Sequence, residues 1–368
     1  MSQWEKVEIG KCCTSISNVK ADYFSNVDKF VYIDISAIDR ETKTICSIEP
    51  MLAGDAPSRA KQIIKKDDVL ISTVRPNLNA VAKVNALADG AIASTGFCVL
   101  RSNPEVINST YLYYFVRSNS FIEYLNGLAT GASYPAVSDK IVKSCKIPLP
   151  PLDIQKQIVA RLELALALVD QRKQQLGLMD SLIQSIFYEM FGDPVKNEKG
   201  WETKNFNAYF DIKTGKLDSN AMVENGKYPF FTCAKEIFSI DSFAFDQEAL
   251  LLAGNNAAGK YDVKYYKGKF NAYQRTYVLT VNNDEYKFSK VLLDKQLQLL
   301  EWMSKGSNTR YITLEILNRL PLFSPPLPLQ RQFAKRVERI EALKKQMTTS
   351  LTELEQNFNS LMQQSFGG

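Results

Sequence analysis

One fourteen-residue segment occurs twice in this chain, at 150–163 and again at 325–338. At a fixed offset of 175 positions the two copies share both prolines, the following leucine, two glutamines, an arginine and a glutamate, which makes seven identical residues. A repeat of this length within one chain indicates a duplicated architecture. The rest of the sequence should therefore divide into two globular units, each of which leads into this segment.

Each copy of the segment opens a long helix with a narrow apolar seam. Apolar residues in 152–192 and 327–368 recur at alternating spacings of four and three, which is the pattern of a coiled coil. Gly192 followed by Pro194 ends the first helix. Such seams must be buried, against each other or against partner chains. The predicted seam residues are Ile158, Leu162, Val169, Leu176, Met179, Ile183, Phe333, Val337, Ile340, Met347, Leu351, Leu354 and Phe358.

The segments outside these helices, 1–151 and 193–326, predict mixed α/β units. Neither shows the regular alternation of strands and helices of a nucleotide-binding sheet. Strand-like runs occur at 30–33, 68–74, 96–100, 147–149, 248–252 and 276–280, and helical patterns at about 109–125 and 289–303.

Composition leaves nucleic-acid binding possible without requiring it. The 368 residues carry a net charge of +5. None of the segments 1–151, 152–192, 193–326 and 327–368 has a net charge above +2. The sequence shows no signal segment and no apolar run of about 18 residues, so we expect a cytoplasmic protein without a membrane role. Histidine is absent, which makes imidazole catalysis and a zinc site improbable, and the six cysteines show no CxxC spacing. They predict buried free thiols.

A run of basic and aromatic residues in the second unit could bind DNA. Lysines neutralise phosphates, whereas Asn, Gln and Arg can read base edges. The alternative is an ordinary solvated hairpin face. The candidates here are Asn255, Asn256, Lys260, Lys264, Tyr265, Lys267, Lys269, Gln274 and Arg275, with Asn308 and Arg310 from the loop that closes the unit.

The first unit has a smaller set of candidates. A loop after a predicted strand carries Arg and Asn, the residue types that read guanine and adenine, although an ordinary polar turn would have the same composition. The candidates are Arg59, Lys61, Arg75, Asn77 and Asn79, with Ser133 and Tyr134 from the closing loop.

No catalytic motif accompanies these candidates. The run at 324–327 is superficially similar to the Asp/Asn-Pro-Pro-aromatic loop of amino-methyltransferases, but it lacks the aromatic residue that stacks on a flipped base. No Gly-rich loop for S-adenosylmethionine and no Walker-type loop is present. Three Glu-x-Lys matches are too loose a pattern to indicate a nuclease.

The repeated features together resemble the specificity subunit of type I restriction–modification systems. They are the Trp-Glu openings at Trp4 and Trp201, the glycine-containing closing loops, and the Pro-Pro-Leu-x-x-Gln-x-Gln helix starts at 150–157 and 325–332. The likeness covers essentially the whole chain. The loop at 131–135 is similar to the family's Gly-Ser-x-x-Pro pattern, but Arg310 stands where the second copy would have proline.

The resemblance implies an α+β fold, with two mixed α/β target recognition domains separated by two long helices that form an antiparallel coiled coil. The first recognition domain would span 1–151 and the central spacer helix 152–192. The second recognition domain would span 193–326 and the C-terminal spacer helix 327–368. Because recognition domains diverge strongly within the family, base-contacting residues cannot be transferred by motif.

The implied function is non-catalytic recognition of a bipartite sequence in double-stranded DNA. Each recognition domain would read one half, while the helices set the spacing and dock two methyltransferase subunits. DNA methylation, translocation and cleavage would belong to the methyltransferase and restriction/translocase subunits. The chain itself then needs no cofactor, and S-adenosylmethionine, ATP and Mg²⁺ serve those partners. The near-neutral domains leave one alternative, a coiled-coil scaffold or adaptor without DNA specificity.

Overall fold

The computed structural model describes residues 4–20, 22–25, 27–131, 134–256, 259–306 and 308–367. Its contacts divide the chain into two compact units. Unit 1 comprises Met1–Arg172 with Ser350–Gly368, and unit 2 comprises Lys173–Thr349. Each unit thus contains one globular part and a segment of each long helix, α4 (Leu152–Phe191) and α8 (Leu327–Phe366).

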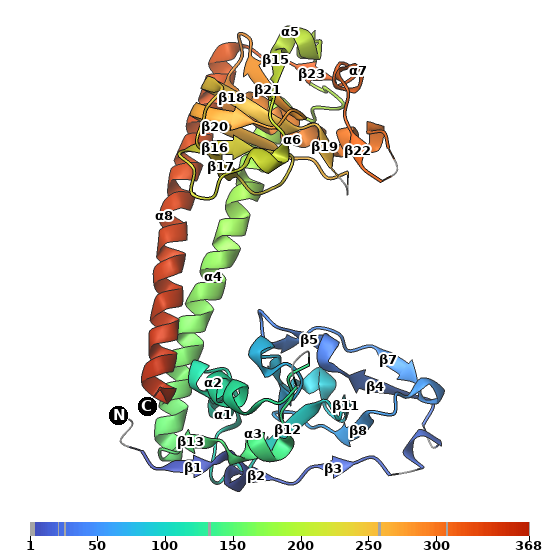
Figure 1. Ribbon diagram of the computed structural model, residues 1–368, viewed down its shortest axis with the longest axis vertical. Coiled ribbons are helices and arrows are strands. Elements are labelled where there is room, and N and C mark those ends of the chain that lie inside the picture. Colours follow the sequence, from blue (N-terminus) through green and yellow to red (C-terminus); the bar gives the residue numbers. More distant parts are fainter. Residues whose placement is uncertain are drawn as a thin grey trace. The chain divides into compact units, whose positions relative to one another are not determined.

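Unit 1 contains two sheets with helices on one side (Figure 1). A four-stranded sheet has the order β10-β9-β12-β2, and a five-stranded sheet has the order β3-β8-β11-β4-β7. Strand pairs β1-β13 and β5-β6 complete it. The strands are β1 Lys6–Glu8, β2 Cys13–Thr14, β3 Ser17–Asn18, β4 Lys29–Ile33, β5 Ile38–Asp39, β6 Thr44–Ile45, β7 Pro50–Leu52, β8 Ala60–Ile63, β9 Val69–Ser72, β10 Val81–Lys83, β11 Ile92–Ser94, β12 Phe97–Ser102 and β13 Lys146–Pro148; the helices are α1 Ser109–Phe115, α2 Asn119–Leu128 and α3 Asp139–Ser144.

Unit 2 is built on one six-stranded sheet of order β15-β21-β18-β20-β16-β17. Leu250 of this sheet shares a buried core with Phe288 and Leu292 of helix α6. The strand pairs β14-β23 and β19-β22 lie outside it. The strands are β14 Thr203–Lys204, β15 Phe210–Thr214, β16 Tyr228–Phe231, β17 Phe238–Ile240, β18 Phe245–Ala253, β19 Asn255–Asn256, β20 Val263–Ala272, β21 Thr276–Val281, β22 Arg310–Tyr311 and β23 Leu322–Phe323; the helices are α5 Phe206–Tyr209, α6 Tyr286–Met303 and α7 Leu314–Leu317.

A buried glutamine fixes the start of each long helix to its globular part. Gln155 is fully buried, where its amide nitrogen donates to the carbonyls of Val106 and Pro150 and its oxygen accepts from the amide of Asn108. The side chain thus joins the start of α4 to the segment before α1, and its own buried polar atoms are all paired.

The second copy repeats this arrangement with its own glutamine. Gln330 donates to the carbonyl of Pro325 and to Asp284, and it accepts from the amide of Glu285. The first glutamine shared by the two sequence repeats is therefore a structural residue. The second shared glutamine, Gln157 in α4 and Gln332 in α8, is exposed.

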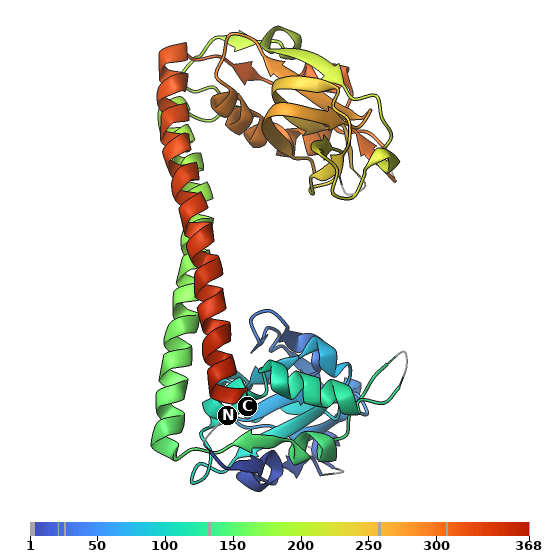
Figure 2. The ribbon, with the colours of Figure 1, turned by 60° about the vertical axis from the view of Figure 1, so that its left-hand side comes forward.

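Within each unit the local segments of α4 and α8 run side by side in opposite directions (Figures 1 and 2). In unit 1, Leu162 shares a core with Phe358 and Met362. In unit 2, the ring of Phe333 lies 5.7 Å from that of Phe187 and 5.4 Å from that of Phe191. All thirteen predicted seam residues are buried or half-buried.

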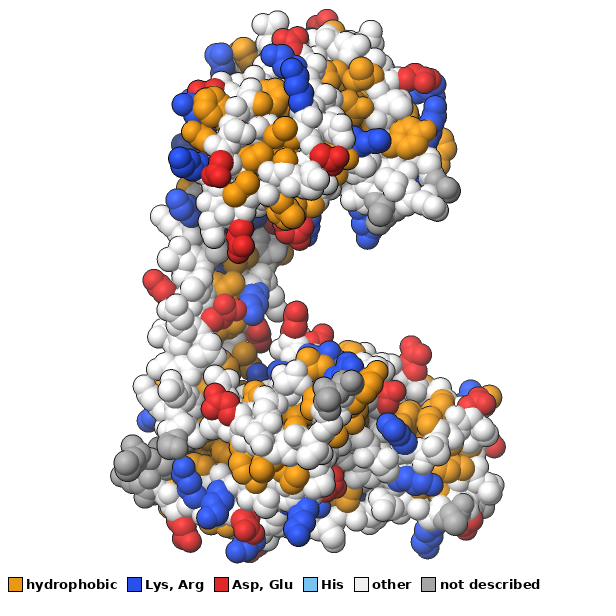
Figure 3. Space-filling view, viewed as in Figure 1, with side chains coloured by type: hydrophobic (Ala, Val, Ile, Leu, Met, Phe, Trp, Pro, Cys, Tyr) orange, Lys and Arg blue, Asp and Glu red, His pale blue; other side chains and the backbone are white. Residues whose placement is uncertain are grey.

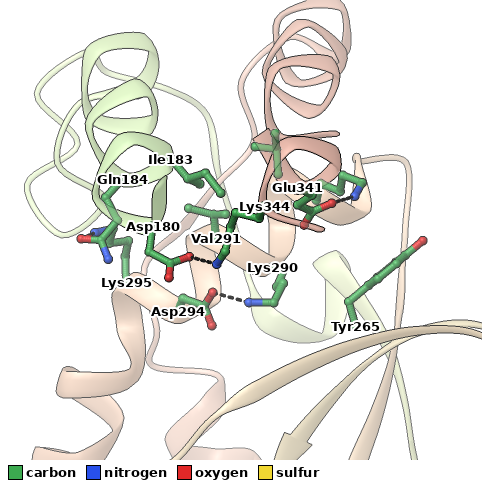
Figure 4. A pocket seen from close by; sticks show the side chains of 12 residues that line it. Asp180, Ile183, Gln184, Tyr265, Lys290, Val291, Asp294, Lys295, Glu341 and Lys344 are labelled. Carbon is green, nitrogen blue, oxygen red and sulfur yellow. Dashed lines mark hydrogen bonds and ion pairs between the residues drawn. The ribbon is translucent and has the colours of Figure 1, made fainter. Parts of the chain in front are cut away.

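Lys344 is a polar residue within the apolar seam of α8, and it pairs with a residue of α4. Lys344 of α8 donates to Asp180 of α4 at 2.6 Å, while Lys287 of α6 pairs with Glu341 of α8. These groups line a pocket of about 490 Å³ between α4, α6 and α8 in unit 2 (Figure 4). These ion pairs connect neighbouring helices, and we interpret the pocket as the junction between the helix pair and the globular part of unit 2.

The sequence located most of these elements, and the structure corrects one of them. The runs at 30–33, 68–74, 96–100, 147–149, 248–252 and 276–280 correspond to β4, β9, β12, β13, β18 and β21, and the pattern at 289–303 to α6. The helix expected at 109–125 is two helices, α1 and α2. The break occurs because the Ser118 hydroxyl caps a new helix by accepting from the Phe121 amide.

Replacement of Gln155 by leucine, which has a similar volume, should destabilise unit 1. The amide of Asn108 and the carbonyl of Val106 would lose their partner, and each unsatisfied buried group costs about 1–3 kcal/mol. Gln157→Leu is the matched control, since Gln157 is exposed and should change stability by no more than about 0.5 kcal/mol. Thermal denaturation and hydrogen exchange at the Asn108 amide measure the difference, and equal behaviour of the two variants would contradict the structural role.

Candidate nucleic-acid interface

Two loops distant in sequence meet beside the sheets of unit 1. The first follows β9 and spans 73–79; the second spans 130–137 and leads into α3. The amide of Val137 donates to the carbonyl of Thr73 at 2.9 Å, and the amide of Arg75 donates to the carbonyl of Pro135 at 2.7 Å. Thr130 and Ala136 close the second loop with two backbone hydrogen bonds. We call these segments the paired loops of unit 1.

Unit 2 holds two loops in the same hydrogen-bonded frame. They span 254–260, after β18, and 305–312, with 257, 258 and 307 outside the described residues. The amide of Ile312 donates to the carbonyl of Gly254 at 2.8 Å, and Lys305 and Tyr311 exchange two backbone hydrogen bonds. These bonds are the counterparts of those made by Val137 and by Thr130 with Ala136. We call them the paired loops of unit 2.

A further backbone bond anchors the first loop of each pair to the neighbouring turn. The amide of Thr73 donates to the carbonyl of Gly96 in unit 1, and the amide of Gly254 donates to the carbonyl of Arg275 in unit 2, both at 2.9 Å. Arg275 therefore occupies the place that Gly96 has in unit 1. The frame is shared while the side chains it displays differ.

A glycine is required at the bend of the second loop in both units. Gly131 has φ +102°, and a Cβ there would lie 2.8 Å from the carbonyl oxygen of Tyr134. Gly306 has φ +107°, and a Cβ there would lie 2.2 Å from the carbonyl oxygen of Thr309. The contact falls three residues further on in each case, so the glycines that coincide in the sequence repeat also coincide in geometry.

The unit 1 candidates fall mainly on the paired loops. Arg75 adopts a left-handed backbone conformation with φ 49°, and its guanidinium lies 4.6 Å from the centre of the Tyr134 ring. Tyr134 is 69% exposed, so the pair forms an accessible surface. Asn77 is exposed in the same loop, and Asn79 is half-buried. Ser133 lies outside the described residues.

The other two unit 1 candidates lie on or beside β8. Arg59 is exposed, and its carbonyl accepts from the amide of Thr95, the residue before Gly96, which places it beside the paired loops. Lys61 is also exposed, but its carbonyl accepts from Val19 at the outer edge of the five-stranded sheet. The structure thus places Arg59 near the other candidates, whereas Lys61 lies apart from them.

In unit 2 the paired loops bring together candidates from three parts of the sequence. Asn255 and Asn256 pair with Tyr311 and Arg310 as strands β19 and β22. With Thr309 and Tyr273, the two asparagines border a pocket of about 610 Å³. Gln274, Arg275 and Asn308 are exposed.

Two buried polar atoms among the paired loops of unit 2 have no hydrogen-bond partner among the residues that the structure describes. They are Oδ1 of Asn255 and Nε of Arg310, although Nη2 of Arg310 donates to the carbonyl of Ser304 at 3.2 Å. Unpaired buried polar atoms are rare and costly in folded proteins. The two atoms therefore support the paired loops of unit 2 as a candidate binding site.

The remaining unit 2 candidates do not form one surface. Side chains on β20 alternate between the two faces of the sheet, so neighbours in sequence point apart. Lys264 donates to Asp262 and to the carbonyl of Ala234, whereas the hydroxyl of Tyr265 donates to Glu248 on the face covered by α6. Burial raises the pKa of Tyr265. The side chains of this run of basic and aromatic residues therefore lie on both faces of the sheet.

Three lysines of that run remain exposed. Lys267 pairs with Glu248 at 3.2 Å, Lys269 lies 4.7 Å from the centre of the Phe243 ring, and Lys260 is the last residue of the first paired loop. On the face shown in Figure 3, lysine and arginine side chains are interspersed with acidic ones. Any phosphate contact in this region would come from single lysines rather than a continuous basic surface.

The cysteines are all free, and three of the six are fully buried. Burial raises the pKa of Cys13 and of Cys145 to about 12, so their thiols stay protonated. The expectation of burial is wrong for Cys46, which is exposed directly after the short strand β6. Within the described residues no group of three or more Cys, Asp or Glu could hold a metal ion, and no helix is long and apolar enough to cross a membrane.

Alignment of the two sequence repeats did not show that the first paired loop of unit 1 is equivalent to the first paired loop of unit 2. Gly131 and Gly306 coincide at the offset of 175, but Thr73 matches Gly254 at an offset of 181. The shift arises because Val137 follows Thr73 by 64 residues, whereas Ile312 follows Gly254 by 58. The available signal was that each first loop follows an apolar run, 69–71 in unit 1 and 249–253 in unit 2.

Alanine at Gly131 should distort the paired loops of unit 1. The positive φ costs an L-residue about 1–2 kcal/mol, and the new Cβ would displace the Tyr134 carbonyl. Gly127→Ala is the control, because nothing lies within 4 Å of a Cβ there and alanine favours its helix, α2. We expect a lower melting temperature for Gly131→Ala and an equal or higher one for Gly127→Ala, and the reverse order would contradict the geometry.

Comparisons with known proteins agree on one family. The chain is 37% identical over 156 residues to the type I restriction enzyme EcoDI specificity subunit of Escherichia coli, a match that covers 42% of this chain and 34% of that protein. It is 23% identical to the MjaIX specificity subunit of Methanocaldococcus jannaschii over 67% of this chain and 68% of that protein. The chain thus spans between a third and two thirds of these curated relatives.

A solved structure matches over almost the whole chain. It belongs to work on complex assembly and conformational transition of the type I R-M system, and it is 27% identical with a TM-score of 0.66. The match covers 98% of this chain and 97% of that one. The model of the type I restriction modification DNA specificity domain matches residues 1–177 and 198–356. The chain therefore belongs to the family of type I restriction modification DNA specificity domain proteins.

Proposed function

We propose that this chain is the DNA sequence-recognition subunit of a type I restriction–modification complex. Each unit reads one half of a bipartite target in double-stranded DNA. One observation carries the proposal: both units present the same paired-loop frame, anchored by equivalent backbone bonds, while the side chains on it differ. One frame with two sets of polar side chains is what two different half-sites require.

The side chains on the frames have the chemistry for base reading. Arg75 projects from unit 1 beside Tyr134, and a guanidinium reads guanine through two parallel hydrogen bonds. In unit 2, Asn256 takes the place equivalent to that of Arg75, Asn255 precedes it, and Arg275 lies at the place of Gly96. An amide reads adenine by donating and accepting at once. Lys260, Lys267 and Lys269 would neutralise phosphates without reading sequence.

The chemistry of the complex would belong to partner subunits. Family membership supports a recognition role without catalysis for this chain. Two methyltransferase subunits would bind S-adenosylmethionine, and restriction/translocase subunits would use ATP and Mg²⁺. The long helices would set the spacing between the two half-sites and carry the methyltransferase subunits.

Substitution of one arginine in each unit tests the bipartite assignment. The bipartite target is first determined by binding-site selection with the wild-type complex. Arg75→Lys and Arg275→Lys keep the charge but lose the two-pronged hydrogen bonding. Each should relax preference at one position, by about 1–3 kcal/mol, and the two positions should lie in different halves of the target.

Arg339→Lys is the control, because Arg339 is exposed on the long helix α8, which contributes no residue to the paired loops. It should leave the selected sequence unchanged. Changes confined to one half of the target for both arginines, or a uniform loss of affinity without loss of preference, would overturn the assignment.

A further inference from the structure

Unit 1 contains a polar pocket where the end of α8 meets the start of α2. Its volume is about 860 Å³, and its lining residues all belong to unit 1. Two cations line it, Lys43 from the turn between β5 and β6 and Arg117 from the segment between α1 and α2. Glu123 supplies a carboxylate. Most of the other lining side chains are amides and hydroxyls, namely Ser118, Asn119, Ser120, Gln356, Asn359, Ser360 and Gln363.

Unit 2 has a pocket at the equivalent place in the duplicated architecture. It is the pocket of about 490 Å³ between α4, α6 and α8. At the offset of 175, four lining positions of one pocket correspond to four of the other, Phe358 to Ile183, Asn359 to Gln184, Asn119 to Asp294 and Ser120 to Lys295. The charges in the two pockets can therefore be compared directly.

The lysines in the pocket of unit 2 are balanced by acidic side chains of the same unit. The fourth of the four lining lysines, Lys295, donates to the side-chain oxygen of Gln184 at 2.7 Å. The other three form ion pairs, Lys287 with Glu341, Lys290 with Asp294, and Lys344 with Asp180 (Figure 4). This pocket therefore balances most of its own positive charge.

The cations in the pocket of unit 1 lack such acidic partners. Lys43 donates to the carbonyl of Asn79 at 2.6 Å, and the Arg117 guanidinium lies 4.9 Å from the centre of the Tyr113 ring. Within the part of the chain that the structure describes, neither cation forms an ion pair with a carboxylate. Burial lowers the pKa of Lys43, and the charges of Arg117 and Arg40 lower it further. Like charges that are held together without a counter-charge favour the binding of an anion.

Lys43 also joins this pocket to the paired loops of unit 1. Its ammonium binds the carbonyl of Asn79, the last residue of the first paired loop, which has a left-handed backbone with φ 44°. Its own carbonyl accepts from the hydroxyl of Tyr113 on α1 at 3.0 Å. An anion bound beside Lys43 would therefore lie next to a loop that we propose reads bases.

We propose that the pocket of unit 1 is a binding site for a phosphate group. Arg117 would bind two phosphate oxygens with its planar guanidinium, and Lys43 would supply a compact point charge. The surrounding amides and hydroxyls would donate to the remaining acceptor oxygens. The phosphate comes either from the DNA backbone beside the half-site of unit 1 or from a free phosphorylated compound. The first source rests on the proposed function, whereas the second does not.

The salt dependence of DNA binding tests the first source. The affinity of the full chain for the selected target is measured over a fourfold range of salt for the wild type, Lys43→Gln, Arg117→Gln and Arg117→Lys. A lost phosphate contact lowers the slope of log affinity against log salt by about 0.9. The factor by which each Gln variant loses affinity over this range should therefore be about three times smaller than for the wild type. Arg117→Lys keeps the charge and should keep the wild-type slope.

Lys344→Gln is the matched control for this experiment. It removes the same charge from the equivalent pocket of unit 2, and its partner Asp180 is exposed and stays hydrated. Its slope should equal that of the wild type. The same change of slope in Lys344→Gln, or a loss of slope in Arg117→Lys, would contradict a phosphate contact in the pocket of unit 1.

Thermal denaturation of the full chain tests the second source. Sodium phosphate and sodium chloride are compared at one ionic strength. If the site takes a free phosphate, phosphate should raise the melting temperature of the wild type and of Lys344→Gln, but not that of Lys43→Gln or Arg117→Gln.

The two experiments separate the site from the proposed function. Gln variants that match the wild type in both experiments would overturn the phosphate site. A wild-type complex that selects no bipartite sequence would instead overturn the proposed function, and the effect of phosphate on the melting temperature would then still decide the site.

Discussion

The structure depends on how each long helix is fixed to its globular part, and one buried glutamine does this at each start. Gln155 and Gln330 each bind the carbonyl of a proline five residues earlier and a backbone amide from the globular part. A buried amide that satisfies several backbone groups at once is strongly directional, because any rotation of the helix would leave those groups unpaired. The helix direction relative to its own unit is thereby set.

Because the start of each long helix is fixed, different faces of the helix lie in different surroundings. One face carries the apolar seam and packs within each unit, through Leu162 with Met362 and through Phe187 with Phe333. Residues on other faces of these helices, among them Arg161 and Arg336, are exposed. A helix that could rotate would exchange these faces, so the buried glutamine that stabilises the fold also determines which side chains the helix exposes.

The paired loops, where we propose that recognition takes place, separate the frame from the side chains it displays. The bonds of Thr73, Arg75 and Val137 are between backbone atoms, so the side chains at these positions can change without loss of the frame. The bend residues Gly131 and Gly306 are constrained by their positive φ, and Arg75 and Asn79 also adopt a left-handed backbone. This arrangement explains how two units can share an architecture and still differ in nearly all residues outside the helix starts.

The sequence by itself determined the duplication, the two long helices and most strands, because these follow from patterns between residues close in the chain. It could not determine that 73–79 meets 130–137, or that Gly254 corresponds to Thr73, because those contacts depend on strand pairing across long separations and on the different length of chain between the two loops of each unit. It also grouped Lys264 and Tyr265 in one run of candidates. Only the tertiary structure decided which face of β20 each occupies, since the helix that covers one face comes from a later part of the chain.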